Sequence, residues 1–205
     1  MDSKYQEILS GAIQMFKQIG IRSVSMDDIA QELHVSKKTI YQYFKNKEEL
    51  IVAMLKYRHD NDMITFEDLD LPNDCNAIDV LLKVSFTVCK NINETSHSQM
   101  FELQKYYPKQ FKQFWAMKRD TIFRQIKENI EQGKKQDLYR NDLDSELMSI
   151  LYVRRLEDLS HINEELFIKY PFELVFKTMF ESHIRGISNA NGIAYFEKKK
   201  KELNY

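Results

Sequence analysis

The hydrophobic residues of this chain recur with the spacing of α-helices. Over residues 5–19 they stand three and four positions apart, which makes one helix face apolar: Tyr5, Ile8, Leu9, Ala12, Ile13, Phe16 and Ile19. Gly20 follows at a position typical of a helix end. Ser25 precedes Met26 and two aspartates, which is typical of an N-cap with acids in the first turn and predicts a short second helix.

A third short helix is expected after a tight turn at residues 34–35. Ser36 can cap this helix, and Ile40 and Phe44 would face inward. A fourth helix is expected to begin near Lys47. The first fifty residues therefore predict three short helices and the start of a longer one.

Longer helices are expected along the rest of the chain, and an acid-rich stretch over residues 60–74 is interpreted as a connection. The expected helices cover residues 76–92, 98–107, a stretch that stops at Gly133, residues 144–159 and a stretch after Pro171. The predicted fold is all-α, with about nine helices and no strands. The expected domains are residues 1–48, a larger helical domain over 49–190 and a polar tail over 191–205.

The composition supports this fold class and excludes others. Only 5 glycines and 3 prolines occur in 205 residues, too few for the many turns of a β-sandwich or barrel. No apolar run of about 18 residues is present, so we expect no membrane span. The N-terminus lacks the pattern of a secretion signal, and the 2 cysteines lack a metal-binding spacing. We expect a cytoplasmic protein with reduced thiols, no cofactor and no metal.

Charge is distributed unevenly along the chain. The net charge of −1 argues against a nucleic-acid partner, but residues 36–47 carry four lysines and no acid, with Tyr41 and Tyr43 among them. Two short helices joined by a tight turn, the second capped and basic, are typical of a helix-turn-helix. Such a helix can enter the major groove of DNA, while lysines neutralise phosphates. Ser36 and the amides after it suit a phosphate.

Residues 5–55 resemble the DNA-binding domain of the TetR family of bacterial transcriptional regulators. The resemblance rests on Ala12, Phe16, Gly20, Ser25, Ile29-Ala30, Val35-Ser36 and the run Ile40-Tyr41-Gln42-Tyr43-Phe44-Lys45-Asn46-Lys47-Glu48-Glu49-Leu50. Over residues 75–190 the likeness lies only in helix order and length. His34 stands where the family often has glycine, and we interpret it as a turn residue with positive φ.

The resemblance implies a homodimer that binds a partly palindromic operator in double-stranded DNA. Most members of the family repress, some activate, and a small-molecule effector usually releases the DNA. Positions that usually touch phosphates are matched by Ser25, Tyr41, Tyr43 and Lys47. The exposed positions of the recognition helix, where base contacts are made, are occupied by Lys37, Lys38, Thr39 and Gln42.

The larger domain would then hold the effector and the dimer contact. An apolar or aromatic effector could be lined by Met100, Phe101, Tyr107, Trp115, Tyr152 and Phe176, although each position also fits ordinary core packing. The apolar stripe after Pro171 is wide enough for its own core and a second copy. The expected dimer contacts are Leu147, Leu151, Phe172, Val175, Met179, His183 and Ile187.

Two other functions remain open at this point. His59-Asp60 would fit a helical metal-dependent hydrolase, but no second histidine lies at a matching helical spacing, and a metal centre needs several convergent donors. A helical interaction module without DNA binding would make the basic segment accidental. Metal in the purified protein would favour the first alternative, and failure to bind mixed duplex DNA at low salt would favour the second.

Overall fold

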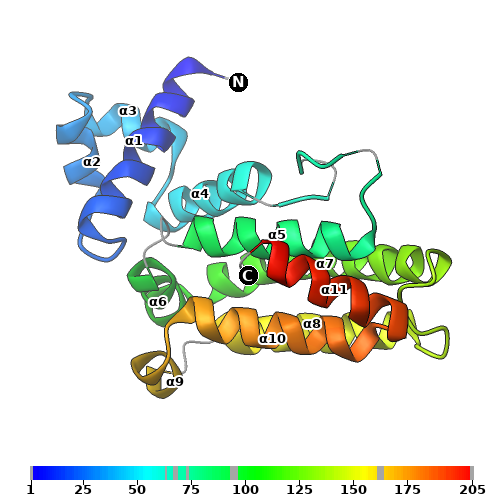
Figure 1. The fold of residues 1–205 in the computed structure, drawn as a ribbon. Helices are drawn as coiled ribbons and strands as arrows, with labels where there is room; N and C mark the ends of the chain where they lie inside the picture. The colour runs from blue at the N-terminus through cyan, green and yellow to red at the C-terminus, as the bar shows by residue number, and fades with distance from the viewer. Residues whose placement is uncertain are drawn as a thin grey trace. The chain divides into compact units, whose positions relative to one another are not determined.

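The chain folds into helices α1 to α11 (Figure 1). The computed structural model describes residues 2–62, 64–66, 69–72, 74–92, 97–160 and 164–203. Across these ranges no β-strand occurs, apart from an isolated bridge between Tyr139 and Ser188. The predicted all-α fold is confirmed. None of the described helices is both long and apolar enough to cross a membrane.

The helices belong to two compact units, which differ from the expected domains. Unit 1 comprises Met1–Met63 and Asn93–Lys118, and unit 2 comprises Ile64–Ile92 and Arg119–Tyr205. The expected boundary at residue 48 therefore falls inside unit 1, and a segment from the middle of the chain joins the N-terminal helices. Part of the predicted connection over residues 60–74 lies outside the described residues.

Unit 1 is built on the N-terminal helices α1 (Ser3–Ile19), α2 (Met26–Glu32), α3 (Lys37–Tyr43) and α4 (Lys47–Asp62). It also contains α6 (His97–Tyr106) and the first part of α7 (Pro108–Lys135). One hydrophobic core joins all of these helices, and it includes Ile8, Phe16, Ile29, Ile40, Leu50, Leu103, Phe111 and Phe114. Residues after position 97 thus complete the core of the N-terminal helices.

The helix ends of unit 1 follow the sequence prediction. Gly20 ends α1 with a φ of 97°, in a region that glycine adopts freely. At the start of α2 the Ser25 hydroxyl accepts from the Asp28 N–H at 3.1 Å, and the Asp28 carboxylate accepts from the Ser25 N–H at 2.8 Å. The Ser25 hydroxyl also donates to the Asp28 carboxylate at 2.7 Å, and this bond, together with the one from the Ser25 N–H, lowers the pKa of Asp28. Ser36 caps α3 by accepting from the Thr39 N–H at 3.0 Å.

Unit 2 contains α5 (Ala77–Ile92), the rest of α7, α8 (Ser145–Ser160), α9 (Glu164–Lys169), α10 (Phe172–Ile187) and α11 (Ala190–Glu202). Its core includes Ile78, Leu81, Ile126, Ile130, Tyr139, Tyr152, Phe180, Ile184 and Phe196. The short helix α9 was not predicted. The helices predicted over residues 76–92 and 144–159 and after Pro171 are confirmed within one residue or so at their ends.

Gly133 has a different role from the predicted helix stop. It lies inside α7, which continues to Lys135. A Cβ at Gly133 would lie 2.0 Å from Cδ2 of the buried Tyr139 ring, so glycine makes room for that ring. The Tyr139 hydroxyl donates to the Asn129 amide oxygen at 3.1 Å, and the Asn129 amide donates to the Ala77 carbonyl at 2.9 Å.

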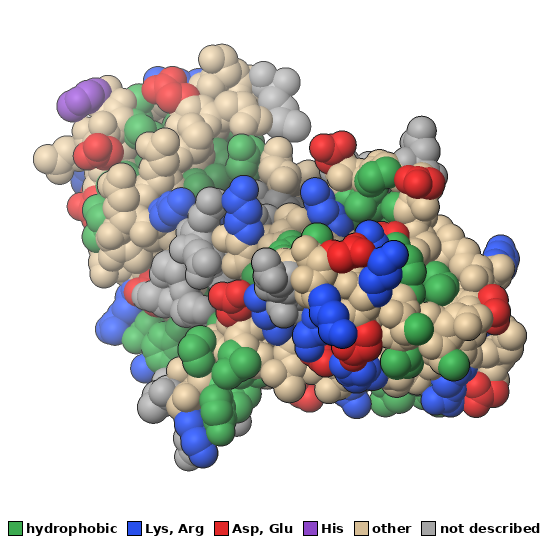
Figure 2. Space-filling view, viewed as in Figure 1, with side chains coloured by type: hydrophobic (Ala, Val, Ile, Leu, Met, Phe, Trp, Pro, Cys, Tyr) green, Lys and Arg blue, Asp and Glu red, His purple; other side chains and the backbone are tan. Residues whose placement is uncertain are grey.

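The predicted polar tail over residues 191–205 is wrong, because α11 packs on unit 2. Asn189 caps this helix by accepting from the Gly192 N–H at 3.0 Å, and Phe196 is fully buried. Figure 2 shows basic and acidic side chains interleaved over α11. Lys200 of α11 forms an ion pair with Glu181 of α10 at 2.6 Å. The apolar spacing of Ile193 and Phe196 was overlooked beside the lysine run.

Candidate nucleic-acid interface

The turn between α2 and α3 has the geometry expected of a helix-turn-helix. His34 has a φ of 52°, and only Asp137 shares a positive φ among the non-glycine residues that the structure describes. The Val35 N–H donates to the Ala30 carbonyl at 3.0 Å, which closes the turn. The left-handed conformation predicted for His34 is therefore confirmed, in a residue type that tolerates it better than most.

The buried residues of α3 determine which of its side chains face solvent. Ile40 and Phe44 are 0% and 1% exposed, as predicted. The outward positions carry the exposed residues Ser36, Lys37, Lys38, Tyr41 and Gln42, with Thr39 half-buried. Three of the four predicted base-contacting residues, Lys37, Lys38 and Gln42, are thus accessible to solvent.

The lysines of this segment have different surroundings. Lys37 Nζ donates to Asp27 Oδ2 at 2.6 Å, and this hydrogen bond raises the pKa of Lys37. Lys38 and Lys45 are exposed, and neither pairs with a carboxylate in the part of the chain that the structure describes. Two positive charges therefore remain available to an anion, while Asp27 holds a third.

Tyr43 is anchored to the start of the chain. Its hydroxyl donates to Asp2 Oδ2 at 2.8 Å, and this bond raises the pKa of Tyr43. The Tyr43 ring packs edge-on against Tyr5, with the ring centroids 6.5 Å apart. The Tyr43 hydroxyl has one hydrogen, so donating it to a phosphate would require breaking the bond to Asp2.

Three of the predicted phosphate-contacting residues line one hollow of about 300 Å³ in unit 1. Its walls are Arg22, Ser23, Val24, Ser25, Met26, Asp27, Tyr41 and Lys47. Tyr41 is 48% exposed at this hollow. Lys47 Nζ donates to the Arg22 carbonyl oxygen at 3.1 Å, and burial lowers the pKa of Lys47. Sequence reasoning missed Arg22 and Asp27, whose proximity to the other residues depends on the folded loop.

The predicted effector-pocket residues are divided between the two units. Met100, Phe101, Tyr107 and Trp115 belong to unit 1, and Tyr152 and Phe176 belong to unit 2. Met100, Tyr107 and Trp115 pack against the unit 1 core. The Trp115 indole N–H is buried and has no hydrogen-bond partner among the described residues. Tyr152 and Phe176 are 5% and 3% exposed.

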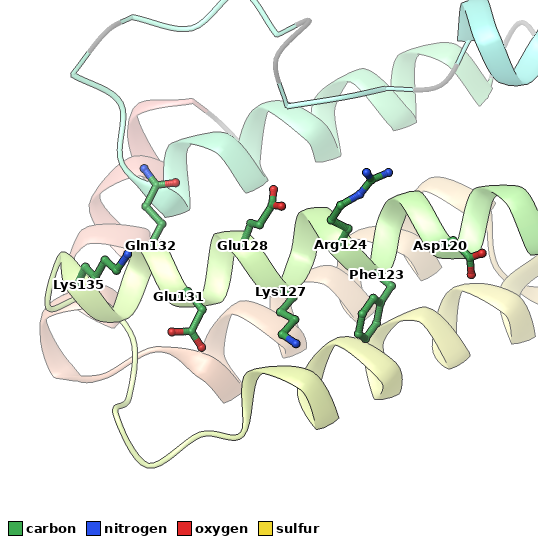
Figure 3. A pocket seen from close by; sticks show the side chains of 8 residues that line it. All are labelled: Asp120, Phe123, Arg124, Lys127, Glu128, Glu131, Gln132 and Lys135. Atoms are coloured by element: carbon green, nitrogen blue, oxygen red, sulfur yellow. The ribbon is translucent and has the colours of Figure 1, made fainter.

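A second, larger hollow of about 830 Å³ runs along α7 in unit 2 (Figure 3). Its lining is mostly charged: Asp120, Phe123, Arg124, Lys127, Glu128, Glu131, Gln132 and Lys135. Lys127 also pairs with Glu146 of α8 at 2.9 Å. This surface differs in chemistry from the apolar pocket that the sequence predicted.

Two of the predicted dimer contacts point into unit 2. His183 and Ile187 are 3% and 0% exposed, so the prediction for these two is wrong. The His183 ring packs on Tyr152 at 4.3 Å between centroids, and burial lowers the pKa of His183 to about 4. The stripe on α10 was too wide to show which edge faced inward. Phe172, Val175 and Met179 are half-buried, and Leu147 and Leu151 on α8 are exposed.

The metal-site alternative gains little from the geometry. His59 Nδ1 lies 3.1 Å from Asp60 Oδ1 on α4. No group of three or more metal-ligating side chains comes together among the residues with described placement. His161 lies outside those residues.

The geometry defines a helix-turn-helix protein in which a capped, basic recognition helix is followed by further helices. Residues 8–54 match the family model described as "Bacterial regulatory proteins, tetR family". Over these N-terminal residues the chain is similar to that family of regulatory proteins.

Individual relatives extend this comparison. The chain is 40% identical over 60 residues to the uncharacterized HTH-type transcriptional regulator YuxN of Bacillus subtilis, across 29% of this chain and 21% of the relative. It is 37% identical over 60 residues to the HTH-type transcriptional activator FasR of Mycolicibacterium smegmatis, across 29% and 27%. These matches span less than a third of each relative's length.

A likeness over the whole fold comes from solved structures. A TetR transcription regulator from Haloarcula marismortui aligns with a TM-score of 0.74 at 14% identity, covering 92% of this chain and 100% of that chain. This similarity concerns the fold alone. The two relatives named above are described as HTH-type transcriptional regulators.

Proposed function

We propose that this protein is a transcriptional regulator that binds double-stranded DNA through α3. The observation that carries the proposal is the unpaired positive charge at α3. Lys38 in the helix and Lys45 just after it have no carboxylate partner among the described residues. Ser25, Tyr41 and Lys47 line a hollow in the same unit. Lysines release counterions when they meet phosphates, and a helix in the major groove reads base edges.

Selection of bound duplexes from a random library tests this function and yields the operator. Lys47→Ala should weaken binding to all duplexes and flatten the salt dependence by about one unit, as expected for a phosphate contact. Gln42→Ala should instead relax base preference. No enrichment of any sequence, together with no binding to mixed duplex at low salt, would contradict the proposal. Far-ultraviolet circular dichroism verifies that both variants fold.

The working unit is proposed to be a homodimer that contacts a palindromic operator. Support comes from α8, where Leu147, Ile150 and Leu151 are 52%, 43% and 47% exposed, and from α10, where Leu174 is 52% exposed. Exposed apolar residues on neighbouring helices of one unit suit a two-fold contact with a second copy.

Sedimentation of Leu151→Glu tests the dimer. A charge placed in an apolar contact should dissociate it, while Leu203→Glu serves as the control because Leu203 is also exposed, at 47%, but lies at the end of α11. The dimer proposal fails if the parent protein sediments as a monomer at micromolar concentration with and without DNA.

An apolar or aromatic effector that weakens DNA binding is proposed to bind near Met100, Tyr107 and Trp115. The buried Trp115 indole N–H supports this location, because it has no hydrogen-bond partner among the described residues. An acceptor atom of a bound effector could accept a hydrogen bond from it. Coupling of about 1–3 kcal/mol is typical, and operator DNA must then weaken effector binding by the same factor.

The single tryptophan offers a direct assay for such an effector. Hydrophobic metabolites, dyes and fatty acids that shift the thermal transition should also change Trp115 fluorescence. Each hit is then titrated with and without operator. Hits that bind with equal affinity in the presence and absence of operator would show that effector binding does not control DNA binding.

Repression is the proposed sign of regulation, since most members of the resembled family repress. One of the relatives above is named as an activator, so the sign needs its own test. A reporter gene placed behind the selected operator should rise in expression when this protein is deleted. A fall on deletion would make the protein an activator.

A further inference from the structure

Three side chains of helix α6 bond to the end of α1 and to the loop between α1 and α2. Gln99 Nε2 donates to the Phe16 carbonyl oxygen at 2.9 Å, and Glu102 Oε2 accepts from the Arg22 N–H at 3.0 Å. The Tyr106 hydroxyl accepts from Arg22 Nη1 at 2.8 Å, and the guanidinium carbon lies 4.6 Å from the centroid of the Tyr106 ring. The loop is therefore fixed at its backbone and at one side chain.

Gly20 allows the Glu102 carboxylate to come this close. Its φ of 97° belongs to the left-handed region, and a Cβ there would lie 2.9 Å from Glu102 Oε1. Another side chain would be strained by the backbone conformation and crowded by the carboxylate. The close contact of the Glu102 carboxylate with the loop thus depends on glycine at position 20.

The same loop forms one wall of the hollow proposed to receive a DNA phosphate. Arg22 and Ser25 are among the lining residues, and Lys47, which also lines the hollow, donates to the Arg22 carbonyl oxygen. No α6 residue is among those that line the hollow. Glu102 and Tyr106 therefore act on the site through the loop and not by contact with its occupant.

We propose that Glu102 is a positioning residue for DNA binding, which sets the α1–α2 loop so that Arg22 and Ser25 can meet a backbone phosphate. The proposal rests on the function proposed above. Charge alone predicts the opposite effect of substitution, because removal of a carboxylate near the interface reduces repulsion of DNA. The two explanations therefore differ in sign.

Two substitutions at Glu102 separate these explanations. Glu102→Ala removes the acceptor and the charge, and should weaken binding to the selected duplex about tenfold, the scale of one hydrogen bond. It should also flatten the salt dependence by about one unit, because one phosphate contact is lost. Glu102→Gln keeps an acceptor for the Arg22 N–H and should bind at least as tightly as the parent.

Glu7→Ala is the matched control, since it removes an exposed carboxylate from α1 without touching the loop. Affinities are expressed per active molecule, as measured by stoichiometric titration, so that partial unfolding of a variant does not imitate weaker binding. Binding by Glu102→Ala that equals or exceeds the parent's would overturn the proposal. Equal weakening in Glu102→Gln would also overturn it.

Hydrogen exchange separates failure of this proposal from failure of the proposed function. The Arg22 amide should exchange faster in Glu102→Ala than in the parent, and Glu102→Gln should restore its protection. If the parent protein binds no duplex, the proposed function fails. If the Arg22 amide exchanges at the same rate in Glu102→Ala as in the parent, Glu102 does not hold the α1–α2 loop and this proposal fails.

Discussion

Four lysines lie in or beside α3 and four lie in α11, yet the two groups have different surroundings. In α11, Lys198 and Lys199 pair with Glu202 and Lys200 pairs with Glu181, while Lys201 has no carboxylate partner among the described residues. Beside α3, Lys38 and Lys45 have no such partner among the described residues. The same number of lysines therefore leaves more unpaired positive charge at α3 than at α11. Of the two groups, only the one at α3 also lies at a hollow and at a capped helix start.

The largest effect should follow from disturbing how α11 packs. A Cβ at Gly192 would lie 2.1 Å from the Leu138 carbonyl oxygen, so Gly192→Ala should lower the free energy of unfolding by about 3 kcal/mol or more. DNA affinity per folded molecule should not change. Urea unfolding measures the first quantity and duplex titration the second.

Gly186→Ala provides the control for that helix substitution. Nothing lies within 4 Å of the Cβ that it would add on α10, and alanine favours helices over glycine, so stability should rise by about 0.5–1 kcal/mol. If Gly186→Ala loses as much stability as Gly192→Ala, the clash with the Leu138 carbonyl oxygen is not the cause of the loss at Gly192.

Releasing Lys37 of α3 from its ion pair should have the next largest effect. Asp27→Asn removes the partner of Lys37 and one negative charge from the surface, and should tighten duplex binding about three- to tenfold at low salt. The gain should shrink as salt rises, because exposed charges are screened. Weaker binding at every salt concentration would show that Asp27 supports the interface.

Breaking an ion pair of α11 should change stability and not DNA binding. Glu181 accepts from Lys200 and Arg185, and these bonds lower its pKa below the usual 4.5. The stabilisation is therefore present above about pH 4.5 and is lost as the pH falls below it. Glu181→Gln should cost about 1 kcal/mol at pH 7 and lose less stability than the parent between pH 4.5 and 3. Thermal unfolding across this range measures both.

The smallest effect concerns the turn that places α3. Because His34 has a φ of 52°, His34→Gly should raise the free energy of unfolding by about 0.5 kcal/mol and leave duplex affinity unchanged. His34→Ala should lower the free energy of unfolding, because alanine adopts a positive φ less readily than histidine does. The opposite order in chemical denaturation would rule out backbone strain as the cause.

The local features of unit 1 were readable from the sequence. The caps at Ser25 and Ser36, the left-handed turn at His34 and the inward positions of Ile40 and Phe44 all depend on neighbours within a few residues. Short-range hydrogen bonds and helical spacing suffice to predict such features.

Features that depend on distant residues were not readable. The contact of Glu102 with Arg22 joins positions 80 residues apart. The inward placement of His183 on α10 likewise depends on which side of the helix meets Tyr152. A periodic pattern identifies an apolar face but not the element that covers it.

The most direct test of the account compares the two lysine groups in one assay. Lys38→Ala with Lys45→Ala, and Lys198→Ala with Lys201→Ala, each remove two exposed positive charges. The slope of duplex affinity against salt should fall by about two units for the first pair and stay at the parent's value for the second. Equal slopes for the two pairs, or a larger loss from the α11 pair, would contradict the assignment of DNA binding to α3.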